Sequence, residues 1–454
     1  MKLAVVGLGK LGGPMAAVMA HKGHAVIGVD VNPAYVTALQ QGRAPVTETG
    51  LEEMVAANRA RLSATLDCEQ AVLESDVTFI IVPTPSGDDG MFSLRYVLSA
   101  AEKIGGALRK TKEWRLIALC STVMPGSTGS RLLPALEAHS GKKCGADFGL
   151  CYNPEFIALG SVIRDMLNPD MILIGESDER SGALLESLYR GVCESNPRIQ
   201  RMNFVNAELT KISVNTFVTT KISYANMLAQ ICETLPGADV DVVTGALGCD
   251  SRIGRKYLKG ALGYGGPCFP RDNIAFSAMA RKNGVPAVLA EATDRVNRRQ
   301  IPRVAEAILS RLPQGGTAGI LGLSYKPDTD VVEESQGLAI ARRLAAAGAR
   351  VAVYDPAAMD NAKPLLAGNV VFAASASECA RQADVLAITT PWEEFRRVGA
   401  ADLERPEGRV AVVDCWRLLD KAAISAVADY TVLGLGAGKP PKHEEAVAAE
   451  CDGD

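Results

Sequence analysis

The chain opens with a glycine motif that constrains its fold more than any other feature. The motif follows a short apolar run directly, and it spaces its glycines as Gly-x-Gly-x-x-Gly at Gly7, Gly9 and Gly12. A strand that turns tightly on glycine into a helix is typical of the first βαβ unit of a doubly wound sheet. The start of the chain therefore predicts an α/β domain with a mostly parallel sheet.

Three contexts favour a dinucleotide site at this motif. The apolar run Leu3–Val6 predicts a strand before it, and the pattern of Pro14–His21 predicts a helix after it. Ala25–Val29 predicts a second strand that ends at Asp30, where an acid can bind the ribose hydroxyls. A carboxylate there would repel a 2′-phosphate, and the neighbouring Asn32 is neutral. The sequence therefore predicts NAD rather than NADP as the cofactor.

The alternation of strands and helices continues along the chain and then repeats. Two further buried strands are expected at residues 77–82 and 116–119, and the βαβ order predicts helices on both faces of the sheet. A second set begins near Thr317, with a helix over Gly337–Ala347 and strands at 319–323, 350–354, 385–389 and 410–413. This set lacks the three-glycine fingerprint, so we interpret it as a Rossmann-like domain that has lost or changed its cofactor role.

Between the two sets, helical spacing predicts a long helix from Asn206 to about Leu235. Its broad apolar face suits a domain connector or dimer spine, and an ordinary core helix is the alternative. The predicted fold class is α/β, with two Rossmann-like doubly wound parallel-sheet domains joined by a central long-helix dimerisation domain. The expected domains are 1–200, which binds NAD, 201–300, which is helical, and 301–436, followed by a disordered tail at 437–454.

Composition argues against several classes of protein. The net charge of -4 gives no case for a nucleic-acid partner or an acidic membrane surface. No apolar run approaches the roughly 20 residues of a membrane span, so no membrane partner is expected. The 11 cysteines are odd in number and scattered without export signal, which predicts reduced thiols in a cytoplasmic protein. The four histidines have no metal-ligand spacing, and we expect no metal site.

The candidate nucleophile is Cys268, which lies within the stretch Gly265–Asp272. Glycines on one side would let a substrate approach the backbone, and Arg271 and Asp272 on the other could tune a thiolate and handle protons. The alternative is a buried cysteine in a turn. A reactive cysteine together with a nucleotide cofactor predicts the oxidation of an alcohol or aldehyde through a thioester.

Two loops follow strands of the first set at the edge where parallel sheets bind ligands. They are Val82–Pro85, which contains Thr84, and Ser121–Gly126, which contains Thr122. Simple turn chemistry is the alternative for both loops.

Three further side chains are candidates for catalysis. Glu155 follows a proline in an apolar setting, where it is either a base of raised pKa or a surface carboxylate. Lys211 and Asn215 are four residues apart, so they share one face of the long helix. Such a pair can hold an oxyanion or a water, although a solvated helix edge is the alternative.

These pieces, in this order, resemble the UDP-glucose/GDP-mannose dehydrogenase family of nucleotide-sugar dehydrogenases. The resemblance covers the chain from Gly7 to about Leu435. Besides the glycine motif, it rests on the motifs Val82–Pro85, Ser121–Val123, Asn153–Phe156, Ala207–Lys211 with Asn215, Arg252–Gly254, Gly265–Asp272, Gly322–Pro327 and Tyr354–Pro356.

The resemblance implies oxidation of a sugar C6 alcohol to the carboxylate by two NAD in turn, yielding a uronic acid for a surface polysaccharide. Cys268 would attack the aldehyde intermediate, and the resulting thiohemiacetal would be oxidised to a thioester that water cleaves. Lys211 would stabilise charge on the C6 oxygen, and Glu155 would act in the hydrolytic half. The implied catalytic residues are Cys268, Lys211, Asn215, Asp272, Glu155 and Thr122.

The same resemblance implies the binding residues. For NAD these are Gly7, Gly9, Leu11, Gly12, Asp30, Thr84, Thr122 and Arg271. For the nucleotide sugar they are Phe156, Lys211, Arg252, Tyr264, Gly265, Lys326 and Arg417. Arg252 would reach the substrate of the neighbouring subunit of a homodimer built on the long helix.

The chain departs from the usual pattern of the family at five positions. Leu159 replaces a carboxylate, Pro267 a serine and Arg271 a lysine. Val331 and Glu333 stand where an Asp and an Arg are common. Reversing a charge beside a diphosphate site should alter nucleotide or subunit contacts. The sugar is therefore left open between glucose, N-acetylhexosamines and other hexoses.

Two alternatives to a four-electron dehydrogenase remain. A two-electron hydroxyacid dehydrogenase would share the first domain and a helical lysine, but it would lack the cysteine stretch and the second Rossmann-like domain. A non-catalytic NAD-binding protein would fit the changes at Leu159 and Glu333, but the retained Cys268, Lys211 and Asp272 argue against it.

Overall fold

The computed structural model describes residues 1–438, so residues 439–454 of the predicted disordered tail lie outside the described residues. The chain forms two compact units. Unit 1 comprises Met1–Thr216 and Arg271–Ala287, and unit 2 comprises Phe217–Pro270 and the chain from Val288 onward. The three-domain division with boundaries at 200 and 300 stays a prediction.

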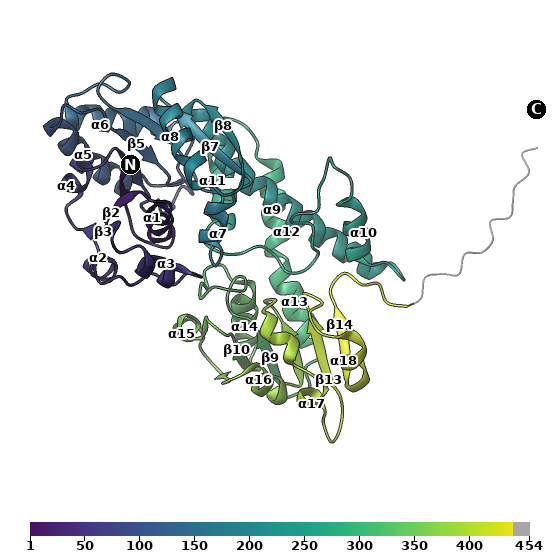
Figure 1. Ribbon diagram of the computed structural model, residues 1–454. Coiled ribbons are helices and arrows are strands. Elements are labelled where there is room, and N and C mark those ends of the chain that lie inside the picture. The colour runs from purple at the N-terminus through teal and green to yellow at the C-terminus, as the bar shows by residue number, and fades with distance from the viewer. Residues whose placement is uncertain (439–454) are drawn as a thin grey trace, which may run out of the picture. The chain divides into compact units, whose positions relative to one another are not determined.

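Unit 1 is built on an eight-stranded sheet (Figure 1). Its strands are β1 (Lys2–Val6), β2 (Ala25–Val29), β3 (Leu62–Thr65), β4 (Val77–Ile80), β5 (Leu116–Leu119), β6 (Gly149–Tyr152), β7 (Met171–Glu176) and β8 (Arg198–Met202). They lie in the order β3-β2-β1-β4-β5-β6-β7-β8, and only the β6–β7 pair is antiparallel among them. The first six strands thus have the 3-2-1-4-5-6 order of a doubly wound sheet.

Helices cover both faces of this sheet. They are α1 (Gly12–His21), α2 (Pro33–Gln40), α3 (Leu51–Ala57), α4 (Cys68–Leu73), α5 (Arg95–Lys110), α6 (Leu133–Ser140), α7 (Val162–Leu167) and α8 (Glu179–Val192), with a π-helical turn at Thr128–Leu132. Successive residues of β1 enter different cores, because Leu3 and Val5 belong to one hydrophobic cluster and Ala4 and Val6 to the other. The central strands are therefore buried and mostly apolar, as the sequence predicted.

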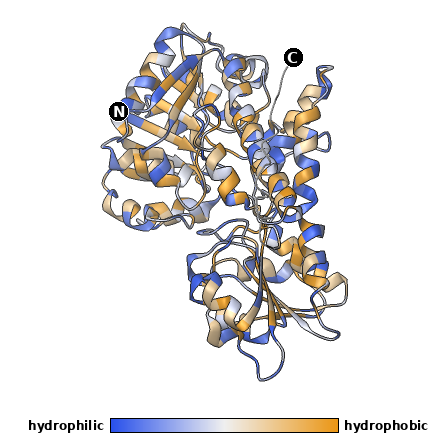
Figure 2. Ribbon diagram, turned by 90° about the vertical axis from the view of Figure 1, so that its right-hand side faces the viewer, coloured by the Kyte–Doolittle hydropathy of each residue, from blue (hydrophilic) through white to orange (hydrophobic). Residues whose placement is uncertain are grey.

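Unit 2 contains a six-stranded sheet that is parallel throughout. Its strands are β9 (Thr317–Leu321), β10 (Arg350–Tyr354), β11 (Val370–Phe372), β12 (Val385–Ile388), β13 (Val410–Asp414) and β14 (Ala428–Val432). The order β11-β10-β9-β12-β13-β14 repeats the 3-2-1-4-5-6 order of unit 1. The strands of both sheets are mostly hydrophobic (Figure 2). This sheet confirms the predicted second Rossmann-like fold.

The helices of unit 2 and the long central helix complete the fold. Around the sheet lie α13 (Gln300–Leu309), α14 (Gln336–Ala346), α15 (Met359–Ala362), α16 (Ala376–Gln382), α17 (Ala400–Leu403) and α18 (Lys421–Val427). The predicted long helix is α9 (Phe204–Thr234), which is 31 residues long and begins in unit 1 and ends in unit 2. The remaining helices are α10 (Val240–Leu247), α11 (Phe269–Lys282) and α12 (Val288–Arg298).

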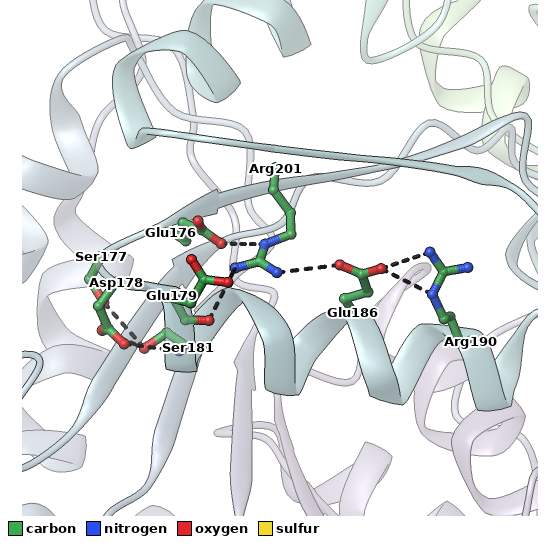
Figure 3. Close-up of polar contacts among 8 residues, drawn as sticks. All are labelled: Glu176, Ser177, Asp178, Glu179, Ser181, Glu186, Arg190 and Arg201. Atoms are coloured by element: carbon green, nitrogen blue, oxygen red, sulfur yellow. Dashed lines mark hydrogen bonds and ion pairs between the residues drawn. The ribbon is translucent and has the colours of Figure 1, made fainter.

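Arg201 joins strands β7 and β8, at one edge of the sheet of unit 1, to helix α8. Arg201 of β8 donates from Nε to Glu176 Oε2 of β7 at 2.7 Å, and its Nη1 lies 3.5 Å from Glu186 Oε2 of α8 (Figure 3). Glu186 also accepts from Arg190 one helical turn later. Because these carboxylates are partly buried and share two arginines, the network stabilises the packing of α8 on the sheet.

Within residues 1–438, no helix is both long enough and apolar enough to cross a bilayer.

Candidate active site

The turn between β1 and α1 leaves no room for side chains at two of its glycines. Gly7 has φ 102°, and a Cβ there would lie 2.1 Å from the carbonyl oxygen of Ile81. A Cβ at Gly12 would lie 1.8 Å from Gly7 O. At Gly9, by contrast, the space within 4 Å is open. The turn is therefore packed tightly on the sheet and open toward a ligand, as the fingerprint predicted.

A cavity of about 600 Å³ opens at this turn, beside the point where the strand order reverses between β1 and β4. Five of the predicted NAD residues line it, namely Gly7, Gly9, Leu11, Gly12 and Asp30. Asp30 Oδ2 accepts from Leu8 N at 2.7 Å and Oδ1 accepts from Asn32 N at 2.8 Å. Each oxygen keeps a further lone pair, so a carboxylate held in this way can still accept from ribose hydroxyls. These residues fit a dinucleotide.

The equivalent turn of unit 2 has a different chemistry. A Cβ at Gly337 would lie 2.1 Å from Gly322 O, so two glycines again pack together, but a long loop separates them in sequence. Asp355 ends β10 as Asp30 ends β2, yet it is buried and accepts from Leu323 N at 2.7 Å and Ala358 N at 2.8 Å, among others. In total Oδ2 accepts four hydrogen bonds and Oδ1 two, so this carboxylate has no lone pair left for a ribose, which supports a changed cofactor role.

The two loops that follow β4 and β5 are joined by hydrogen bonds. Thr84 is buried, and its Oγ1 donates to Thr122 O at 2.7 Å. Ser121 Oγ accepts from Val82 N at 2.9 Å. Arg271 of α11 donates from Nη1 to Thr84 O at 3.2 Å. The structure therefore brings together three of the predicted cofactor residues, Thr84, Thr122 and Arg271.

Glu208 of α9 holds the loop that contains Thr122, a role that the sequence did not indicate. Its carboxylate has no exposed surface and accepts from Gly126 N at 2.5 Å and Thr128 N at 2.7 Å. Burial raises the pKa of Glu208, while the hydrogen bonds from these backbone N–H groups oppose the rise. Nothing in the sequence distinguishes this glutamate from a solvated one near the start of a helix.

Lys211 and Asn215 lie on a buried face of α9, so the alternative of a solvated helix edge is wrong. Lys211 Nζ donates to the backbone oxygen of Glu155 at 2.6 Å and lies 4.6 Å from the ring centroid of Phe156. Asn215 Nδ2 donates to Asp272 Oδ2 at 2.6 Å. A buried ammonium beside a polar pair can stabilise negative charge on a bound oxygen.

Glu155 lies in the segment after β6 and is half-buried, so it is not a freely solvated loop carboxylate. Burial raises the pKa of Glu155 to about 7, against a hydrogen bond with Tyr189 and the charge of Lys211. Leu159 lies in the same loop and packs against the hydrophobic core of unit 1. Glu155 is therefore the one acid between Asn153 and Gly160.

The candidate nucleophile belongs to unit 2. Cys268 is exposed, so the alternative of a buried cysteine is wrong, and it directly precedes α11. A helix N-terminus favours a thiolate over a thiol. The preceding loop is held by Asn297, whose Oδ1 accepts from Tyr264 N at 2.7 Å and whose Nδ2 donates to Tyr264 O at 3.0 Å. Gly266 N also donates to Glu333 O at 3.1 Å.

The other predicted substrate residues of unit 2 lie in varied settings. Arg252 is 87% exposed in its side chain and forms an ion pair with Asp250 at 2.6 Å. Arg417 is largely buried and forms an ion pair with Asp239 at 2.5 Å. Lys326 Nζ lies 6.0 Å from the ring centroid of Tyr325, while Tyr264 and Gly265 are buried. Contact of these residues with a nucleotide sugar stays a prediction.

Comparisons with known proteins agree along the chain. Three domain models of the UDP-glucose/GDP-mannose dehydrogenase family match: the NAD binding domain over residues 1–193, the central domain over 205–299 and the UDP binding domain over 319–421. A UDP-glucose 6-dehydrogenase of Haloferax volcanii is 36% identical over 399 residues, which cover 87% of this chain and 92% of that protein. A GDP-mannose 6-dehydrogenase of Pseudomonas aeruginosa is 34% identical, with 78% and 81% covered.

A solved structure is similar over nearly the whole chain. The UDP-glucose dehydrogenase of Pyrobaculum islandicum superimposes with a TM-score of 0.84 at 36% identity and covers 95% of this chain and 96% of its own.

Proposed function

The chain belongs to the UDP-glucose/GDP-mannose dehydrogenase family, and from that premise we propose that it oxidises the C6 alcohol of a UDP-hexose, UDP-glucose first, to the carboxylate. It is an NAD-dependent nucleotide-sugar 6-dehydrogenase. A UDP nucleotide is favoured because the family's UDP binding domain matches residues 319–421. Four electrons are removed, so two NAD are reduced for each sugar.

One observation carries the proposal. Lys211 and Asn215 are buried on one face of α9, and Asn215 is bonded to Asp272, which follows the exposed Cys268 by four positions in the chain. A cation, an amide, a carboxylate and a thiol are the groups that a covalent oxidation of an alcohol requires.

The cofactor would be held at the β1–α1 turn. Gly9 leaves space for a pyrophosphate at the helix N-terminus, and Asp30 would bind the ribose hydroxyls. When bound, NAD supplies the acceptor for the hydride that leaves C6. Thr84, Thr122 and Arg271 form the braced edge beside which the nicotinamide would be placed.

In the first oxidation, the C6 hydroxyl loses its proton and C6 loses a hydride, which leaves an aldehyde. Lys211 would lie against the C6 oxygen and stabilise the negative charge that develops there. Asn215, oriented by Asp272, would donate a second hydrogen bond to the same oxygen or to a water.

In the second oxidation, the Cys268 thiolate would add to the aldehyde carbon and form a C–S bond. Loss of a second hydride from this thiohemiacetal would give a thioester. Water would then add to the thioester carbon and the C–S bond would break, so that the carboxylate is released and the thiol restored. Glu155 would take part in the proton transfers of this hydrolysis. The covalent bond keeps the reactive aldehyde on the enzyme between the two oxidations.

We also propose a homodimer that buries the second half of α9. Three large apolar side chains recur there every seven residues and are exposed: Phe217 at 67%, Tyr224 at 47% and Ile231 at 45%. Side chains seven apart share a helix face, and such an apolar stripe is costly in water. Phe217→Glu should shift the protein toward a monomer in sedimentation velocity, whereas an unchanged sedimentation coefficient would contradict this interface.

We propose a cytoplasmic location with this function, because the reaction requires a reduced thiol. No disulfide joins the cysteines of residues 1–438.

The deciding experiment is a count of NADH released from a panel of UDP- and GDP-hexoses, including UDP-N-acetylhexosamines, with the product mass measured. Two NADH per UDP-glucose and a product that gains one oxygen and loses two hydrogens are expected. One NADH per sugar would overturn the four-electron proposal in favour of a simple alcohol dehydrogenase. No NADH from any sugar by protein that binds NAD would favour the non-catalytic alternative.

A further inference from the structure

The hydroxyl of Tyr189 lies between two oxygen atoms but has one hydrogen to donate. Tyr189 comes from α8 and is 3% exposed. Its oxygen lies 2.6 Å from Asn153 Oδ1 and 3.1 Å from Glu155 Oε1. All three residues belong to unit 1. A phenol has one hydrogen and cannot donate fully to two acceptors at once. In one of these two contacts the hydrogen must therefore come from the partner of Tyr189.

The orientation of Asn153 decides where the phenol hydrogen goes. Its Nδ2 donates to the backbone oxygen of Leu173 at 3.0 Å, and a carbonyl oxygen can only accept. Nδ2 is therefore fixed toward Leu173, and Oδ1 is fixed toward Tyr189. Since Asn153 is buried and Oδ1 is also only an acceptor, this short contact takes the hydrogen of Tyr189.

The Tyr189 oxygen then presents a lone pair to Glu155. An ionised carboxylate would present a second lone pair at 3.1 Å, and the two would repel. A protonated carboxyl group would instead donate its hydrogen and complete a chain of donors from Glu155 to Tyr189 to Asn153.

We propose that Glu155 rests protonated and donates its hydrogen to the Tyr189 hydroxyl, and that Tyr189, fixed by Asn153, is the positioning residue that maintains this state. The proposal deepens the proposed function and rests on it in one consequence: Glu155 must lose this proton before it can act as a base on water. Hydrolysis of the thioester should therefore be the step that weakens as pH falls.

The other groups around Glu155 fit this assignment. Burial raises its pKa to about 7, even against the lowering that a hydrogen bond donated by Tyr189 would give. Lys211 opposes the rise by its charge, and its Nζ donates to the backbone oxygen of Glu155. The thiols of Cys120 and Cys193 also face Glu155, and burial raises the pKa of both, so neither adds a negative charge near neutral pH.

The test is an infrared difference spectrum of the protein without substrate, wild type minus Glu155→Gln. At pH 6 we expect the carbonyl stretch of a protonated carboxylic acid, shifted when the protein is labelled with ¹³C-glutamate. The subtraction removes any signal of Glu208, whose pKa burial also raises. Absence of this band at pH 6 would overturn the proposal, and the result needs no turnover.

Tyr189→Phe separates the two hydrogen-bond directions. If Glu155 donates to Tyr189, the variant removes the acceptor of its hydrogen, and the ratio of protonated to ionised Glu155 should fall by about tenfold or more at a given pH. If Tyr189 instead donates to a carboxylate, the same variant should raise this ratio, and that result overturns the proposal, as does an unchanged titration. Tyr152→Phe is the matched control, because Tyr152 is also a fully buried tyrosine of unit 1.

Folding and function are checked separately. If Tyr189→Phe fails to bind NAD or loses its cooperative melting, that variant is set aside. The infrared difference between the wild type and Glu155→Gln then decides whether Glu155 is protonated. A protonated Glu155 in a protein that releases no NADH from any sugar would sustain this inference while the proposed function fails. Turnover by a protein whose Glu155 is ionised at pH 6 would support the proposed function and overturn this inference.

Discussion

Asn215 and Asp272 lie 57 positions apart in the chain and are joined by a hydrogen bond of 2.6 Å from Nδ2 to Oδ2. Both side chains are buried, and Arg271 Nε lies 3.6 Å from the other oxygen of Asp272. The bond joins α9, which carries Lys211, to α11, which starts directly after Cys268. The bond therefore holds the polar side chains of α9 against the first turn of α11.

This bond predicts that Asn215 and Asp272 act as a unit. Asn215→Ala and Asp272→Ala should each lower kcat/KM, and the double variant should lose less than the sum of the two effects. Residues in one hydrogen-bonded pair usually show a coupling of about 0.5–3 kcal/mol. Steady-state kinetics of the four proteins measure it, with NAD binding as the control. Strict additivity would mean that the bond does not matter for catalysis.

The thioester route predicts a specific defect in Cys268→Ser. A serine hydroxyl is a much weaker nucleophile than a thiolate near neutral pH, so full turnover should fall by roughly a hundredfold or more. NAD binding, measured by fluorescence, should persist because the β1–α1 turn is untouched. Cys249→Ser is the matched control, since Cys249 is also an exposed cysteine of unit 2. Uronic acid production by Cys268→Ser at the native rate would exclude the covalent intermediate.

Asp30 predicts a preference for NAD over NADP. Asp30→Asn keeps the size of the side chain and one acceptor but removes the charge that repels a 2′-phosphate. A hydrogen bond to a charged group contributes about 1.5–3 kcal/mol, so the ratio of kcat/KM for NAD to that for NADP should shrink roughly ten- to hundredfold. Asp88→Asn serves as a control on an exposed loop. Equal efficiency of the wild type with both cofactors would refute the preference.

The doubly wound fold could be predicted from local patterns. The glycine motif, the apolar runs and the acid after the second run determine a βαβ unit, and its repetition after Thr317 predicts the second sheet. The last strand of unit 1 was missed for a physical reason. Strand β8, Arg198–Met202, is polar and partly exposed at the sheet edge, so it lacks the apolar run that marks a central strand.

The site was harder to predict because periodicity shows which residues share a helix face, but not what covers that face. Lys211 and Asn215 therefore fitted a solvated edge as well as a buried site. The contacts of Tyr189 and Glu208 join residues far apart in sequence, and no local pattern distinguishes these side chains from ordinary members of an amphipathic helix. Asn297 escaped notice for the same reason, since its bonds to Tyr264 depend on tertiary packing.

Glu155 predicts a stability that depends on pH. Burial raises its pKa from the ordinary value of 4.5 to about 7 in the folded protein. The folded state therefore holds the proton more tightly than the unfolded state does. The resulting stabilisation is full below pH 4.5 and is lost as pH rises to about 7. The loss amounts to roughly 3–4 kcal/mol at most, because a tenfold change in proton affinity corresponds to about 1.4 kcal/mol.

Glu155→Gln should not lose stability as pH rises from 4.5 to about 7. A glutamine amide is neutral at every pH and can donate to Tyr189 as a protonated glutamate would, so the free energy of unfolding should not decline through this window. We expect the variant to match the wild type at pH 5 and to exceed it at pH 8 in chemical unfolding. Glu53→Gln, at an exposed position of α3, controls for the general effect of removing a charge. A variant that is less stable than the wild type at pH 8 would show that the ionised carboxylate stabilises the fold, and that its burial is outweighed by Lys211.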